Sequence, residues 1–174
     1  MAPTQREQAE IAVSPCTDAD MEAVEALWPR RGCAERFARQ QSGDSAFLLA
    51  RWTGDVVGRV EVMWTGPRMP RVAEHHPGIP EINGLDVLQS VRRRGIGTAL
   101  LLAAENMARP RGCHTIGLGV GLENPQAERI YRRLGYAGDL AYTDTYVWID
   151  EDGQSHDAAD PCRFLMKALV CNGT

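Results

Sequence analysis

The chain has 174 residues, of which 44% are hydrophobic and 24% charged, and it carries a formal net charge of −4. This composition is typical of one soluble globular domain and excludes disordered, collagen-like and membrane-embedded chains. The acidic balance excludes a general nucleic-acid binder, because such proteins need a basic field to displace counterions from phosphate. The five cysteines lack a CxxC pair or a histidine-rich partner, so we expect reduced thiols and neither a disulfide framework nor a metal site.

Residues 1–12 are polar and unpatterned, and we expect a flexible leader before a single domain that spans residues 13–170. No signal peptide is visible, and no run of about 18 apolar residues occurs in the chain. These features predict a cytoplasmic protein that does not bind a membrane.

The pattern of polar and apolar residues then predicts helices and strands in alternation. A capping-box pair, Thr17 and Asp20, begins the first helical pattern, and Pro29 ends it. Four prolines in residues 65–80 predict a long loop, and an acidic loop over 150–160 joins the last two strands as a hairpin. We expect helices over 17–28, 33–42, 96–107 and 125–134, and strands over 46–52, 56–64, 81–88, 115–120, 142–149 and 162–169.

The order of these elements predicts the fold class. The strand, helix and strand over 81–120 favour a parallel pair with a right-handed crossover, whereas the hairpins on either side favour antiparallel strands. We therefore predict an α/β (α+β) protein with a mixed, mostly antiparallel, twisted sheet and helices on both faces.

A glycine-rich turn joins the strand over 81–88 to the next helix. It reads Arg92-Arg93-Arg94-Gly95-Ile96-Gly97-Thr98. Its amides can point at a phosphate on the positive end of the helix dipole, and the arginines add charge-assisted hydrogen bonds. It matches neither a P-loop nor the GxGxxG dinucleotide fingerprint, and taken alone it is as consistent with a packing turn.

A second motif decides between these interpretations. It runs from Asn124 to Tyr136 and reads NPQAERIYRRLGY. Together the two segments resemble the GCN5-related N-acetyltransferase superfamily, whose pattern is Arg/Gln-x-x-Gly-x-Gly/Ala and, after one strand, Asn-x-x-Ala-x-x-x-Tyr-x-x-x-Gly-Phe/Tyr. The resemblance extends over roughly residues 12–169 in element order and implies a central parallel pair of strands that splays apart.

The resemblance also implies acetyl-CoA as cosubstrate. Its pyrophosphate would be held by the amides of residues 93–98, and its pantetheine arm would run beside Leu85 and Val87. Asn124 would contact that arm, and Tyr131 would lie at the thioester. The implied cofactor-binding residues are Leu85, Val87, Arg92, Arg93, Arg94, Gly95, Ile96, Gly97, Thr98, Asn124 and Tyr131.

Acetyl transfer to an amine requires a base and an acid. A primary amine has a pKa near 10 and arrives as ammonium, so a carboxylate has to take its proton. Glu81, fourteen positions before Gly95, is our first candidate, with Asp86, Glu61 and a carboxylate in 150–160 as rivals. Tyr131 holds the position of the family's tyrosine acid.

An amide freed by a bulge in the central strand can stabilise the developing oxyanion, and Gly84 is a candidate for that bulge, although a packing role fits equally well.

The acceptor is expected in a groove between the first helix, the loop over 65–80 and the acidic hairpin. Residues 139–160 hold seven acids and no lysine or arginine, which favours a polycationic small molecule, as in enzymes that inactivate amine-bearing antibiotics. A peptide α-amine or a lysine is the alternative. The candidate substrate contacts are Trp64, Glu81, Asp150, Glu151 and Asp152.

Two other function classes stay open at this stage: a non-catalytic acetyl-CoA sensor, and a regulator that binds another nucleotide at the glycine turn. The acceptor itself, the use of acyl groups longer than acetyl, and a homodimer through the C-terminal strands also stay open.

Overall fold

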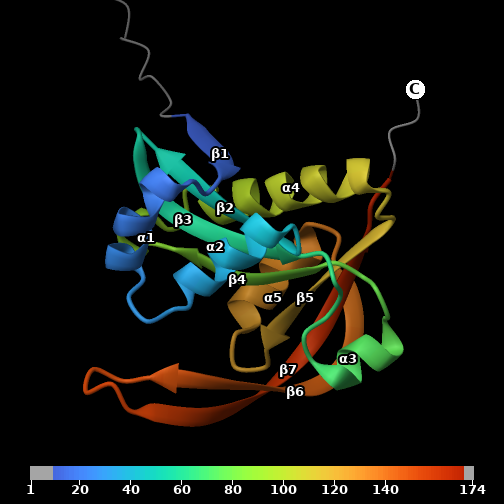
Figure 1. The fold of residues 1–174 in the computed structure, drawn as a ribbon. Helices are drawn as coiled ribbons and strands as arrows, with labels where there is room; N and C mark the ends of the chain where they lie inside the picture. The colour runs from blue at the N-terminus through green and yellow to red at the C-terminus, as the bar shows by residue number, and fades with distance from the viewer. Residues whose placement is uncertain (1–9, 171–174) are drawn as a thin grey trace, which may run out of the picture.

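The computed structural model describes residues 10–170, which are built around one seven-stranded sheet (Figure 1). Only β4 and β5 pair in parallel, and every other neighbouring pair is antiparallel. This confirms the predicted mixed sheet and its parallel pair. In spatial order the strands are β1 (Ile11–Pro15), β2 (Ser45–Trp52), β3 (Asp55–Met63), β4 (Glu81–Val87), β5 (Thr115–Gly121), β7 (Ser155–Ala168) and β6 (Ala137–Ile149).

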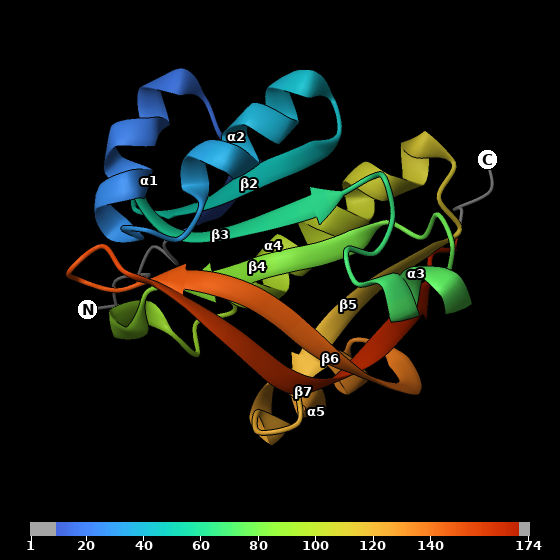
Figure 2. The same cartoon turned by 60° about the horizontal axis from the view of Figure 1, so that its bottom comes forward.

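Helices cover both faces of the sheet, as predicted (Figure 2). The Thr17 and Asp20 capping pair forms, and a short 3-10 turn precedes α1 (Met21–Leu27). This helix and α2 (Cys33–Ser42) pack on one face, where Phe47 and Leu49 are fully buried. The opposite face packs against α4 (Ile96–Ala108) and α5 (Pro125–Arg133).

A separate apolar cluster lies at α3 (Pro70–His75), where Val72 is buried in one group with Tyr142 and Phe164. Strand β5 contributes glycines on this side. A Cβ atom at Gly117 would overlap the Phe164 ring, and one at Gly119 would overlap the Tyr142 hydroxyl. The two aromatic side chains therefore fill the space that side chains of β5 would otherwise occupy.

The structure differs from the predicted elements in three places. The leader expected over 1–12 lies mostly outside the described residues, but residues 11 and 12 belong to β1, whose five residues are too few for a clear alternation pattern. The loop over 65–80 contains α3, with Pro70 at its first position, where proline is tolerated.

The third difference concerns the acidic loop over 150–160. It is only a short turn, because β7 begins at Ser155 and pairs with β6 up to Ile149. That hairpin is largely exposed, so it has no apolar face that the sequence could reveal. None of the described helices is long and apolar enough to span a membrane.

We expect Gly117→Ala to destabilise the fold by about 2 kcal/mol, because the added methyl overpacks the Phe164 ring. Gly121→Ala on the same strand is the matched control, since nothing lies within 4 Å of its Cβ position. Urea unfolding of the two variants measures the difference. Equal unfolding free energies for both variants would show that the Phe164 ring can move aside without a loss of stability.

Candidate active site

The turn between β4 and α4 presents unpaired backbone amides. Arg93 and Gly95 both adopt left-handed backbone angles, with φ of 62° and 82°. The amide of Ala99 donates to the Gly95 carbonyl at 2.9 Å, so the amides of Ile96, Gly97 and Thr98 precede the first hydrogen bond of the helix. Amides at the start of a 13-residue helix form a site suited to an anion.

Contacts of the guanidinium group hold two of the three arginines of this turn in place. Arg92 Nε donates to the Val87 carbonyl at 2.9 Å, and its guanidinium lies 3.6 Å from Asp86 Oδ1. The Arg94 guanidinium stacks over the Trp52 ring at 4.6 Å. All three arginines are exposed, so their remaining donors can reach an anion placed on the turn.

Strands β4 and β5 separate soon after they begin. Their pairing consists of Glu81 with Gly117 and Ile82 with Leu118. From Asn83 onward, β4 has no partner strand on its β5 side within residues 10–170. Leu85 and Val87 lie on this stretch and pack toward α4. The free edge offers backbone donors and acceptors to an extended ligand, as an added strand would use them.

A bulge interrupts β4 at the centre of this stretch. The register of β3 with β4 shifts between Arg59 and Glu61, and Gly84 has a φ of 61°. The bulge expected at Gly84 is therefore present. A bulge leaves one residue out of the ladder, so its amide is available to a ligand.

Glu81 begins β4 and is only 5% exposed. One carboxylate oxygen accepts a hydrogen bond from the backbone amide of Arg68 at 2.7 Å. Burial raises the pKa of Glu81 above its usual range, and the Arg68 amide opposes this only in part. A carboxyl of this kind is better matched to proton transfer near neutral pH than an exposed one.

The rival carboxylates on this face are already paired. Glu61 is fully buried and receives Arg36 at 2.5 Å and Arg39 at 2.8 Å. Burial works to raise the pKa of Glu61, but the hydrogen bonds from Arg39 and the charge of Arg36 outweigh it and hold that pKa low. Asp86 accepts the Trp28 indole N–H at 3.1 Å.

Tyr131 lies on α5, half-buried against the core on the α4 side. Its ring meets Tyr136 edge-on at 6.3 Å between centroids, and its hydroxyl has no hydrogen-bond partner within the described part of the chain. Burial raises the pKa of Tyr131, so the hydroxyl stays protonated and able to donate. Asn124 caps the same helix by accepting the Ala127 amide at 3.1 Å.

The predicted substrate contacts are dispersed. Trp64 packs toward the α4 side, with Arg111 over its ring at 4.3 Å, and its indole N–H is buried without a partner in residues 10–170. Asp150 closes the hairpin turn by accepting the Asp152 and Gln154 amides, and it pairs with His156 at 2.6 Å. Glu151 and Asp152 are exposed at the turn.

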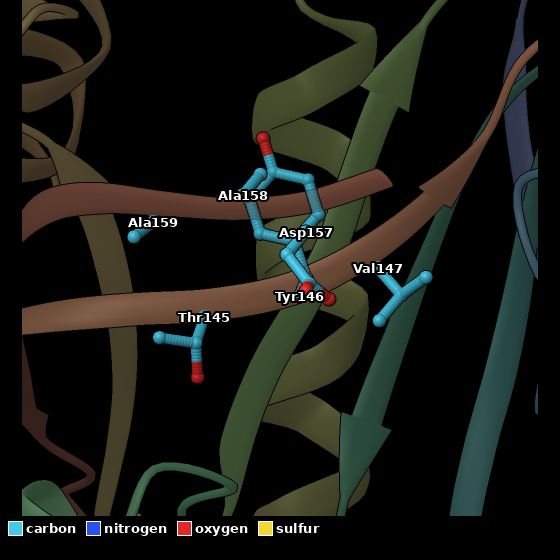
Figure 3. A pocket seen from close by; sticks show the side chains of 6 residues that line it. All are labelled: Thr145, Tyr146, Val147, Asp157, Ala158 and Ala159. Carbon is cyan, nitrogen blue, oxygen red and sulfur yellow. The ribbon is translucent and has the colours of Figure 1, made fainter. Parts of the chain in front are cut away.

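An open hollow on the hairpin lies apart from these groups. None of the predicted site residues lines it, so we do not assign the chemistry to it. Its lining residues are Thr145, Tyr146, Val147, Asp157, Ala158 and Ala159 (Figure 3).

The structure also shows groups that the sequence did not reveal. The buried ion cluster of Arg36, Arg39 and Glu61 joins α2 to β3, and helical spacing gives no sign of which strand residue a helix arginine will meet. Within residues 10–170, no three His, Cys, Asp or Glu side chains are grouped so that they could hold a metal ion.

Comparison with known proteins gives a consistent match. The model of the acetyltransferase (GNAT) family matches residues 13–136. The ribosomal-protein-alanine N-acetyltransferase of Brucella melitensis superimposes with a TM-score of 0.67 at 22% identity, over 91% of this chain and 99% of that one. YncA of Salmonella typhimurium, solved with acetyl-CoA, gives a TM-score of 0.66 at 17% identity, over 95% and 98%.

Among curated relatives, the aminoglycoside N(6')-acetyltransferase type 1 of Klebsiella aerogenes is 29% identical over 119 residues, which are 63% of this chain and 76% of that protein. The chain spans a smaller part of several others, with 24%, 26% and 32% of their length matched.

We expect the raised pKa of Glu81 to appear in how the free energy of unfolding depends on pH. Its pKa is raised in the folded protein, so stability present below the ordinary value of 4.5 is lost as the pH rises through the folded-state pKa. Glu81→Gln keeps an acceptor for the Arg68 amide and removes this loss. The variant should therefore gain unfolding free energy relative to wild type as the pH rises.

Urea unfolding at several pH values between about 4 and 8 measures this trend. The exposed Glu123→Gln is the control and should run parallel to wild type. A constant difference between Glu81→Gln and wild type would mean that Glu81 titrates like an exposed carboxyl.

Proposed function

Because the chain belongs to the acetyltransferase (GNAT) family, we propose that it transfers the acetyl group of acetyl-CoA to a primary amine. One observation carries this proposal: a buried carboxyl of raised pKa, Glu81, begins the same strand whose free edge leads to the α4 turn. A base and an anion site thus lie at the two ends of one strand.

The residues present fit acetyl-CoA. The unpaired amides of Ile96, Gly97 and Thr98, with Arg92 and Arg94, suit its pyrophosphate. The free edge of β4 beside Leu85 and Val87 suits the amide groups of its pantetheine arm. The side-chain oxygen of Asn124 caps α5 by accepting the Ala127 amide, so its NH₂ group is available to donate to the same arm.

In the proposed reaction, the amine attacks the thioester directly in a ternary complex. Glu81 takes the proton of the incoming ammonium, directly or through water. An amide of the Gly84 bulge stabilises the negative charge that develops on the thioester oxygen. As the C–S bond breaks, Tyr131 donates its hydroxyl proton to the leaving thiolate, and the second proton lost by the acylated nitrogen returns to the phenolate, directly or through water. Burial raises the pKa of Tyr131, so the hydroxyl is protonated until this step.

The proposal is tested by acetyl-CoA turnover, measured as free thiol release, over a panel of aminoglycosides, polyamines, amino acids and short peptides. Glu81→Gln and Tyr131→Phe should each lower kcat by about 100-fold or more with the accepted amine, because each removes a proton-transfer group. Coenzyme A affinity should stay unchanged in Glu81→Gln, because Glu81 is not among the residues assigned to the cosubstrate. Tight acetyl-CoA binding with no amine-dependent thiol release would instead favour a sensor.

The class of acceptor is a finer question. The acids of residues 139–160 favour a polycationic small molecule, but Asp144 pairs with Arg68, which offsets its charge, and Asp150 accepts hydrogen bonds from the amides of its own turn. A cationic, antibiotic-like amine therefore stays a hypothesis that rests chiefly on the exposed Glu151 and Asp152. A peptide α-amine is the other candidate.

Neutralising the turn tests the cationic acceptor. Glu151→Gln with Asp152→Asn should raise KM for polycationic amines and leave kcat unchanged, because the turn would act only by attraction. The measurement is KM at low and at high salt. An unchanged KM for every accepted cation would remove the electrostatic argument.

A homodimer also stays a prediction. It is supported by exposed Tyr146, Val147, Trp148 and Ile149 on the edge strand β6, and sedimentation of the purified protein tests it.

A further inference from the structure

Positive charge is in excess on the sheet face that carries Glu61 and Asp86. Two arginines come from α2, one from β3 and one from the loop before α2. We call them the arginine cluster: Arg31, Arg36, Arg39 and Arg59. Glu61, which binds Arg36 and Arg39, is the one carboxylate in residues 10–170 that forms an ion pair with any of them.

Arg59 is a buried cation that forms no ion pair within residues 10–170, although its guanidinium lies over the Trp28 ring at 5.4 Å. It is 4% exposed, and its Nη1 contacts only the Cys33 thiol at 3.3 Å and the Arg31 carbonyl at 3.4 Å. Its Nε is buried with no hydrogen-bond partner in the described residues. A buried charge left in this state is costly to the fold, so it calls for an explanation.

The pKa of Arg59 agrees with this description. Burial lowers it and repulsion from Arg36 works in the same direction, whereas the nearby Cys33 and Asp86 oppose this only in part. The fold thus holds the guanidinium in surroundings that would favour an added negative charge.

Arg36 has free donors next to the bulge of β4. Its Nη1 binds Glu61 at 2.5 Å, but its Nε is buried without a partner and its Nη2 donates to none of the described residues. That Nη2 lies 2.7 Å from the position that a Cβ atom of Gly84 would take. Arg36 Nη2, which donates to none of the described residues, therefore lies against the backbone of the bulge.

We propose that the acceptor is a small primary amine that also carries an oxyanion such as a carboxylate, and that Arg36, with Arg31 and Arg59 behind it, binds this oxyanion. This inference rests on the proposed function, because the amine has to reach Glu81. Glu81 and Gly84 are three residues apart on one strand, about 10 Å, a distance that a short amino acid can bridge with the two side chains.

Guanidinium groups bind carboxylates through two parallel hydrogen bonds, and an oxyanion here would meet donors that now lack partners. It would also offset the charge of Arg59. The inference opposes the polycationic acceptor, which the arginine cluster would repel.

The test compares acceptors that differ only in charge. Thiol release from acetyl-CoA is measured with β-alanine and β-alaninamide, with γ-aminobutyrate and its amide, and with spermidine. The wild type should favour each acid over its amide at least about tenfold in kcat/KM, since a lost charged hydrogen bond costs that much. Arg36→Gln should remove this preference.

Arg39→Gln is the matched control. Arg39 also binds Glu61, but it is 39% exposed and does not contact Gly84. Both variants lose one ion pair of Glu61, so only a role in binding the acceptor separates them. Equal turnover of acids and amides by the wild type, preference for spermidine, or the same loss in both variants would overturn the inference.

If no amine is turned over, β-alanine binding decides the matter. Calorimetry is done with saturating coenzyme A, so that the α4 turn is already filled. Binding that is present in wild type and Arg39→Gln but lost in Arg36→Gln would uphold the oxyanion site while the proposed function fails. Absence of binding to the wild type would overturn the inference itself.

Discussion

The loss of hydrogen bonding between β4 and β5 is the constraint on which the candidate site depends. Two residue pairs hold the parallel strands together, and beyond Ile82 the edge of β4 is free. A free edge inside a sheet exposes backbone groups that need partners, and a fold keeps such an edge only where something else can satisfy them. Apart from Asn124 and Tyr131, which belong to α5 and its cap, everything assigned to cosubstrate binding lies along this edge or at its end.

The two faces of the sheet at this opening have different chemistry. On the α4 side the core is apolar and includes Ile82, Leu100 and Ile116. On the α2 side Glu61 and Arg59 are buried next to the bulge, and the partly buried Arg36 pairs with Glu61 there. Buried ion pairs often add little net stability, so this cluster is better explained by what it positions than by what it stabilises. It fixes Arg36 against Gly84.

The elements that carry the proposed cosubstrate site follow from the sequence more directly than those around the proposed acceptor site. The glycine turn and the Asn124-to-Tyr136 motif are local, because a helix start and a helix face are set by neighbours within a few residues. The contact of Arg36 with Glu61 joins residues 25 apart, and that of Arg68 with Glu81 depends on a loop conformation. Neither contact produces a repeating pattern in the sequence from which it could be predicted.

The same distinction explains the hairpin. The first part of β7 carries small and acidic residues whose alternation does not separate an inner from an outer face, so the acids of 150–160 suggested a loop. The strand β1 was missed for the related reason that five residues give too short a pattern.

The contact between Arg36 and Gly84 has a consequence for how this sequence can diverge. The guanidinium occupies the volume that any side chain at position 84 would need, and the backbone there already favours glycine. A side chain at 84 would push the end of the Arg36 side chain aside and disturb its ion pair with Glu61, so the two positions are coupled. A change at Gly84 therefore carries a cost at Arg36 as well, whereas the exposed turn of the hairpin can change without one.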